Sequence, residues 1–247
     1  MCDIWFNPAT SKFLTDFASQ VIAAIAGAGI GALLGAHYAF RLERIKAATA
    51  REEAARTTAA ELSAKRAVSG NLAMHSLGRM HNTLAGYRRQ FIEPAQQTVA
   101  PWMYMSPGEI PLGDCHRFNA ASLAFLLQSS NPNMLLKLAL AEEQYAAAVQ
   151  IISRRSVFHE QTVPAAVEKL TRNVTDLTEP ELRQLVGPYV YTRLFLDTGY
   201  VVTLVELALT TCQKCGDELN GLLRILLPGE KIISFGAGQN LGESANG

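Results

Sequence analysis

The sequence lacks most of the residue patterns that carry chemistry. Its 22 lysines and arginines are balanced by 22 aspartates and glutamates, so no strongly basic domain predicts nucleic-acid binding. No run alternates convincingly as a strand, which predicts an all-α protein. The phosphate-binding loop, the serine-nucleophile motif and the zinc-protease motif are all missing, so nothing predicts an enzyme or a cofactor.

Cysteine is scarce as well. Four cysteines, two of them close together in a predicted helix, do not make a disulfide scaffold. Cys212 and Cys215 form the sequence CQKC and share one helix face, which makes them weak candidates for a metal site. A structural zinc site needs four ligands, and Cys115 with His116 would complete the set only if the fold brought them close. The pattern therefore favours two ordinary helix cysteines and no bound metal.

What the sequence does contain is one long apolar run, VIAAIAGAGIGALLGAHYAF, at residues 21–40. A helix of this length is roughly 30 Å long, which matches the hydrocarbon core of a bilayer. The run predicts a single transmembrane helix. A cleaved signal peptide is disfavoured because the run is long for a signal and basic residues follow it at once. A buried core helix is the other alternative, because alanine and glycine dominate the run.

Basic residues flank this run unequally. The first twenty residues hold only Lys12, whereas the twenty after the run hold Arg41, Arg44, Lys46, Arg51 and Arg56. Because positive charge stays on the cytoplasmic side, the N-terminus is predicted to face outward and the bulk of the chain to be cytoplasmic. Arg41, Arg44 and Lys46 are also predicted to meet lipid headgroups. The plasma (inner) membrane of a bacterium is the default location, because nothing suggests an organelle.

Small residues recur every four positions within the predicted span. Gly27, Gly31 and Gly35 share one helix face, with Ala24 and Ala28 beside them. Such a face lets two helix backbones approach closely, and close packing is what holds helices together in lipid. The stripe predicts a glycine zipper through which the spans self-associate. The alternative is that glycine and alanine are simply frequent in membrane helices.

The chain divides into five predicted segments. They are a short extracytoplasmic N-terminus (1–20), the transmembrane helix (21–40), a basic helical stalk (41–67), an antiparallel helical bundle (68–229) and a flexible tail (230–247). The stalk is rich in alanine, glutamate and arginine but has few bulky apolar residues, so it is expected to be exposed. Within the bundle segment, helices are predicted at about 114–128, 132–160, 164–174, 178–187 and 189–227.

A heptad spacing appears where the stalk ends. Apolar residues lie four and three apart at Ala73, Leu77, Met80, Leu84, Tyr87 and Phe91. The seam predicts one helix of an intramolecular bundle, and the alternative is a coiled coil between copies of the chain. The run at 189–209 is apolar as well, but it contains Arg193, Asp197 and Glu206. It therefore predicts a central bundle helix surrounded by neighbours rather than a second span.

Prolines break the helical pattern between residues 94 and 111, and this connection has an aromatic centre. Trp102 and Tyr104 lie there, which makes the loop a candidate binding site for a partner. The alternatives are that the loop folds back over the bundle or touches the membrane surface.

Two functions remain after these exclusions. The first is a non-enzymatic, single-pass membrane protein that acts as a scaffold or partner-binding module at the cytoplasmic face. The second is a membrane effector or channel assembled through the glycine stripe. Both predict the lipid bilayer and further copies of the chain as partners, and the first adds an unidentified protein partner.

Overall fold

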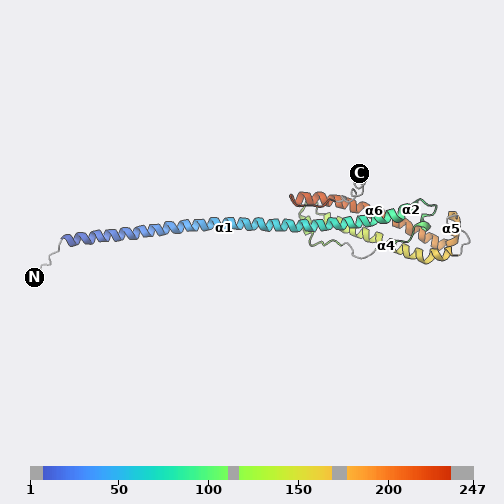
Figure 1. The fold of residues 1–247 in the computed structure, drawn as a ribbon, viewed down its shortest axis with the longest axis horizontal. Helices are drawn as coiled ribbons and strands as arrows, with labels where there is room; N and C mark the ends of the chain where they lie inside the picture. Colours follow the sequence, from blue (N-terminus) through green and yellow to red (C-terminus); the bar gives the residue numbers. More distant parts are fainter. Residues whose placement is uncertain (1–7, 111–116, 169–176, 235–247) are drawn as a thin grey trace, which may run out of the picture. The chain divides into compact units, whose positions relative to one another are not determined.

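The computed structural model describes residues 8–110, 117–168 and 177–234; between residues 8 and 34 it describes the backbone but only the side chains of residues 17, 19 and 21. Every secondary-structure element among these residues is a helix, which confirms the all-α class (Figure 1). The chain separates into two compact units, Met1–Glu61 and Leu62–Gly247. Helix α1 runs from Pro8 to Tyr87 and so belongs to both units.

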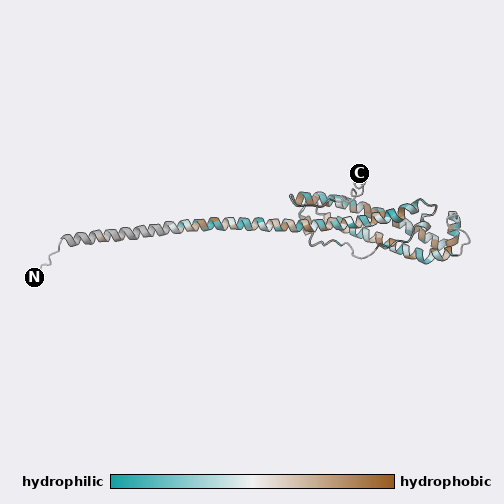
Figure 2. Ribbon diagram, viewed as in Figure 1, coloured by the Kyte–Doolittle hydropathy of each residue, from teal (hydrophilic) through white to brown (hydrophobic). Residues whose placement is uncertain are grey.

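The described residues of the first unit all belong to the N-terminal part of α1. From Gly35 to Leu62 every side chain of the helix is exposed. Hydrophilic and hydrophobic residues are mixed along this part of α1 in Figure 2, as expected for a helix without a buried face. Three of its threonines, Thr49, Thr57 and Thr58, bond to carbonyl oxygens of their own helix, three or four residues back.

A wider helical turn ends α1. The π-helix η1 covers Arg88–Ile92, and the short helix α2 covers Glu93–Gln96. Pro94 has no amide hydrogen, and in a regular helix its ring would crowd the carbonyl of Gln90, so the wider turn relieves this clash. Arg88 then pairs with Glu93 at 3.0 Å and with Glu206 at 3.3 Å. A further single turn, α3, covers Pro101–Tyr104.

Two predictions for the middle of the chain are wrong. The helix expected at 114–128 is only a short 3₁₀ helix, η2, over Ala124–Gln128, and its expected cap Asp114 lies outside the described residues. Helix α4 covers Met134–Val167 and continues through Pro164 instead of ending before it. Because Pro164 lies in the last turn, it removes a single hydrogen bond near the helix end, and the carbonyl of Pro164 still accepts the amide of Glu168 at 2.9 Å.

The last two helices follow the sequence signals closely. Helix α5 covers Glu179–Val186, and its capping box lets the amide of Thr178 donate to Glu181 at 2.8 Å. Gly187 ends α5 with a φ of 81°, a conformation that glycine adopts without strain. Helix α6, Pro188–Leu226, then begins with proline in its first turn, where a missing amide hydrogen costs nothing.

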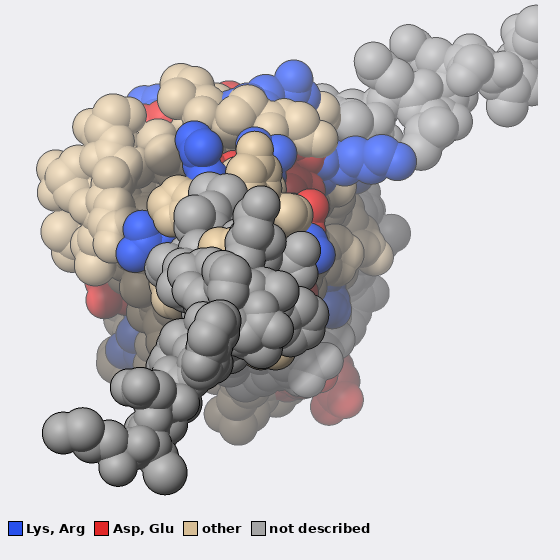
Figure 3. Space-filling model, turned by 90° about the vertical axis from the view of Figure 1, so that its left-hand side faces the viewer, with Lys and Arg blue, Asp and Glu red and all other residues tan. Residues whose placement is uncertain are grey.

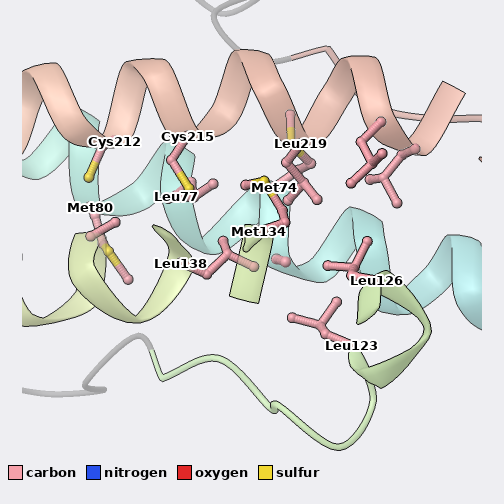
Figure 4. Close-up of a cluster of buried hydrophobic side chains, with 14 of the residues drawn as sticks. Met74, Leu77, Met80, Leu123, Leu126, Met134, Leu138, Cys212, Cys215 and Leu219 are labelled. Atoms are coloured by element: carbon pink, nitrogen blue, oxygen red, sulfur yellow. The ribbon is translucent and has the colours of Figure 1, made fainter. Parts of the chain in front are cut away.

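Three apolar clusters form the core of the second unit. The first joins Ala67–Met80 of α1 to the start of α4 and the end of α6 (Figure 4). The second joins Leu84 and Tyr87 to the middle of α4 and of α6, and the third joins Val163 to Leu194 and the loop around Trp102. Within this unit α1 and α4 therefore run in the same direction, and α6 runs opposite to both.

The heptad seam of α1 lies inside this core. Five of its six residues are buried and Phe91 is half-buried, so the seam packs against α4 and α6 of the same chain. It does not face another copy. Gly70, one turn before the seam, allows a close approach to α6, because a Cβ atom there would lie 2.7 Å from the Cδ atoms of Leu223.

Candidate functional site

The glycine stripe falls mostly outside the described side chains. This applies to Gly27, Gly31, Ala24 and Ala28, of which only the helical backbone is described. Gly35 is exposed, with open space where a Cβ atom would be. The basic residues Arg41, Arg44 and Lys46 that follow are exposed too, and the guanidinium of Arg44 lies 5.8 Å from the ring centre of Phe40. Self-association through the stripe stays a prediction.

The aromatic loop folds back onto the core. Trp102 is 2% exposed and packs edge-on against Tyr191 of α6, with ring centres 5.1 Å apart. Met103 and Met105 are buried with it, and Tyr104 is half-buried. Of the two aromatic residues predicted to meet a partner, only Tyr104 therefore has a side chain at the surface.

Polar side chains from one turn of α4 hold this loop in place. Arg155 Nη2 donates to the carbonyl of Trp102 at 3.1 Å, and His159 Nε2 lies 2.9 Å from the carbonyl of Met103. Ser156 Oγ donates to the carbonyl of Gly108 at 2.9 Å and accepts from its amide at 3.1 Å. We call these three α4 residues the polar triad. They supply partners for loop backbone groups that would otherwise be buried unpaired.

Arg155 is the most unusual member of the polar triad, because it is fully buried. Burial lowers its pKa to about 10, while the nearby Tyr87 and Asp197 act in the opposite direction, so it remains charged at neutral pH. Its Nε donates to Thr198 at 3.1 Å, and Nη1 has no hydrogen-bond partner. The buried Asp197 does not pair with Arg155 directly. It accepts from Arg154 at 2.7 Å and from Arg193 at 2.9 Å instead.

His159 and Tyr87 are the neutral members of this cluster. Burial lowers the pKa of His159, although the contact with the Met103 carbonyl raises it again, so the neutral imidazole donates that hydrogen bond. Burial also raises the pKa of the Tyr87 phenol against the opposing effect of Arg155. Ser156 and His159 bond to different loop carbonyls, so they do not form the hydrogen-bonded pair of a nucleophile and its base.

Cys212 and Cys215 belong to the apolar core. Both are buried free thiols of α6, and in Figure 4 they point from α6 towards Met80 and Leu77. Burial raises the pKa of Cys212 to about 11 and that of Cys215 to about 12. Metal binding needs thiolates, which these surroundings disfavour. Among the described residues, no group of three or more metal-ligating side chains comes together.

One side of α6 is left uncovered, contrary to the expectation that neighbours surround this helix. From Pro188 to Thr210 its exposed residues carry no charge, and the half-buried Arg193 and Glu206 are held in ion pairs with Asp197 and Arg88. They are Pro188, Tyr189, Thr192, Phe195, Leu196, Gly199, Tyr200, Thr203, Leu207 and Thr210. Sequence reasoning missed this surface because periodicity alone does not say which apolar side of a helix meets a neighbour. We call Tyr189, Leu196, Tyr200, Thr203, Leu207 and Thr210 the α6 strip.

Helix α6 is also long and apolar enough to cross a membrane by its length and composition, with 39% of its most apolar window buried. The face of the molecule shown in Figure 3 has lysine, arginine, aspartate and glutamate dispersed among uncharged residues, without a large patch of one sign. No protein-family model matches the chain, and no curated protein or solved structure is significantly similar to it.

Proposed function

We propose that this protein is a non-enzymatic module that is anchored in a membrane by residues 21–40 and binds a partner protein through the α6 strip. The observation that carries the proposal is the α6 strip itself. Exposed helix faces of soluble proteins are normally charged, whereas the centres of protein interfaces are depleted in charge and enriched in tyrosine. The members of the α6 strip are uncharged and include two tyrosines, so the strip has the composition of a binding surface.

The anchor is assigned to residues 21–40 and not to α6. If α6 entered a bilayer, its buried residues would leave the three core clusters, and the charged group around Asp197 would enter lipid. Residues 21–40 form part of α1 and carry no formal charge when His37 is neutral, and exposed basic residues follow them at once. This arrangement supports a span whose cytoplasmic end is at Arg41.

Membrane fractionation tests the anchor. The double variant Ile30→Lys/Leu33→Lys places two charges within the predicted span and should release the full chain from membranes washed with carbonate, whereas the wild type should stay bound. The matched control Leu196→Lys places a charge on the α6 strip and should leave the chain in the membrane. Release by Leu196→Lys instead would assign membrane binding to α6 and overturn the proposal.

The native Cys2 tests the orientation. With the N-terminus outside, a membrane-impermeant maleimide should label Cys2 in intact cells that have had their outer membrane removed. The variant Cys2→Ser should lose that label. Labelling of Cys2 only after cell lysis would place the N-terminus in the cytoplasm and contradict the predicted topology.

A further inference from the structure

We infer that the partner on the α6 strip is a second copy of this chain, and that the two α6 helices pack in parallel as a short coiled coil. The inference deepens the proposed function and rests on it for the direction of packing. It is carried by the spacing of the strip, by its lack of charge and by the position at which α1 enters the second unit.

The spacing of the strip is that of a heptad seam. Its members follow one another at intervals of seven, four, three, four and three residues, from Tyr189 to Thr210. Residues at such intervals line one side of a helix and meet the same residues of a second helix. Arg193 fills the remaining seam position, and its guanidinium is held by Asp197 at 2.9 Å. Unlike the seam of α1, this one is mostly left exposed by the described residues of its own chain, although the Tyr189 ring lies 6.4 Å from that of Phe158 in α4.

The chemistry of the strip suits a second copy. The members of the strip are uncharged, and the one ion in the seam, Arg193, is already paired with Asp197, so two identical faces meet without burying an unpaired charge. The five large side chains on this side of α6 are Tyr189, Phe195, Leu196, Tyr200 and Leu207, and they are between 45% and 72% exposed. At about 200 Å² for a large side chain, each copy offers on the order of 500 Å² of contact area.

The resulting contact is small but sufficient for copies confined to one membrane. Two such faces bury on the order of 1,000 Å² in total, which is the lower limit for specific interfaces. The two threonines in the seam add little apolar area, so the contact should be weaker than that of a leucine-rich coiled coil. Anchoring to a common bilayer raises the local concentration of the copies and so compensates for a weak contact.

The place where α1 enters the second unit decides the direction of packing. Ala67 lies in the same core cluster as Leu222 and Leu223, so α1 enters beside the C-terminal end of α6. In a parallel pair, both copies of α1 enter at the same end of the contact. In an antiparallel pair, they would enter at opposite ends of a strip roughly 30 Å long. Anchors in one bilayer favour the parallel pair.

Site-specific disulfide formation tests this contact in membranes that hold the full chain. The variant Thr203→Cys is made in a Cys2→Ser/Cys115→Ser background, in which the remaining cysteines are buried. Position 203 meets its own counterpart in a parallel pair, whereas in an antiparallel pair centred on the strip it would lie opposite residue 196, so mild oxidation should give a covalent dimer. The control Leu136→Cys lies on an exposed position of α4, and its yield of covalent dimer should be at least tenfold lower. Equal yields would indicate random collision and overturn the inference.

A charge at position 196 provides a second test of the parallel contact. Leu196→Glu and Leu196→Lys should each lower the yield at position 203 at least tenfold, because like charges would face each other across a parallel pair. Coexpression of the two variants should restore the yield, because glutamate then faces lysine. Failure of this rescue, or protection of position 203 from maleimide without crosslinking, would show a different arrangement or a different occupant and overturn the inference.

The outcome separates the contact from the anchor. If the chain is released by carbonate but still crosslinks at position 203, the parallel pair stands and the membrane anchor is wrong. If the chain stays in the membrane and does not crosslink at position 203, the anchor stands and the pairing is wrong.

Discussion

Acidification should destabilise the second unit through His159. Burial holds the pKa of this imidazole below its ordinary value of 6.5, while the contact with the Met103 carbonyl opposes the shift and Arg155 adds to it. Between the two pKa values the unfolded chain binds a proton that the folded chain does not, so stability rises with pH. The stability that neutral His159 contributes is fully present above pH 6.5. It is lost as the pH falls through the pKa that His159 has in the folded chain. Within that window the free energy of unfolding should fall by at most about 1.4 kcal/mol per pH unit.

Fluorescence of the buried Trp102 provides the assay. The full chain, with Trp5→Phe so that Trp102 is its single tryptophan, is unfolded with urea in detergent micelles at pH 7.5, 6.5, 5.5 and 5.0. The matched variant is His159→Gln, because its amide can still donate to the Met103 carbonyl but does not titrate. It should lose most of the pH dependence below 6.5. An unchanged slope in His159→Gln would refute the role assigned to this residue.

Three further outcomes follow from the packing. Gly70→Val should destabilise the second unit by about 1–3 kcal/mol, because Leu223 fills the space beside Gly70. Gly78→Ala should stabilise the unit by about 1 kcal/mol, because Gly78 faces open space. Urea unfolding of the two variants measures both changes. Gly108→Ala would place its Cβ atom 2.8 Å from Phe91, so it should displace the loop and shift Trp102 emission to longer wavelength. The two buried thiols of α6 should react with maleimide only in urea, because burial raises their pKa values to about 11 and about 12; fast reaction in buffer would contradict their burial.

Local signals predicted the ends of the last two helices well. Three local signals set these ends: the capping box at Thr178, the glycine at 187 and the proline at 188. Each acts on the backbone of its own neighbours, so its effect can be predicted without knowledge of the fold. The burial of Leu77 and Met80 in α1 follows from periodicity in the same way, because a heptad face has to be covered by something.

Local signals failed where packing compensates for a local cost. Pro164 should end a helix, but it stands near the C-terminus of α4, where the packing of Val163 in the third cluster outweighs one lost hydrogen bond. The connection before α4 has helical composition, yet only Ala124–Gln128 form a short 3₁₀ helix. Leu123 and Leu126 are buried there against the first cluster.

The sequence by itself determined the all-α class, the apolar run at residues 21–40 with its basic flank, and the periodic faces of the helices, because each depends on residues close together along the chain. Only the tertiary structure decided which faces are covered. It buried Trp102 in a loop whose backbone carbonyls bond to Arg155 and His159, and it left the α6 strip exposed. Coverage depends on which distant segments lie side by side, and the spacing of residues within one helix does not contain that information.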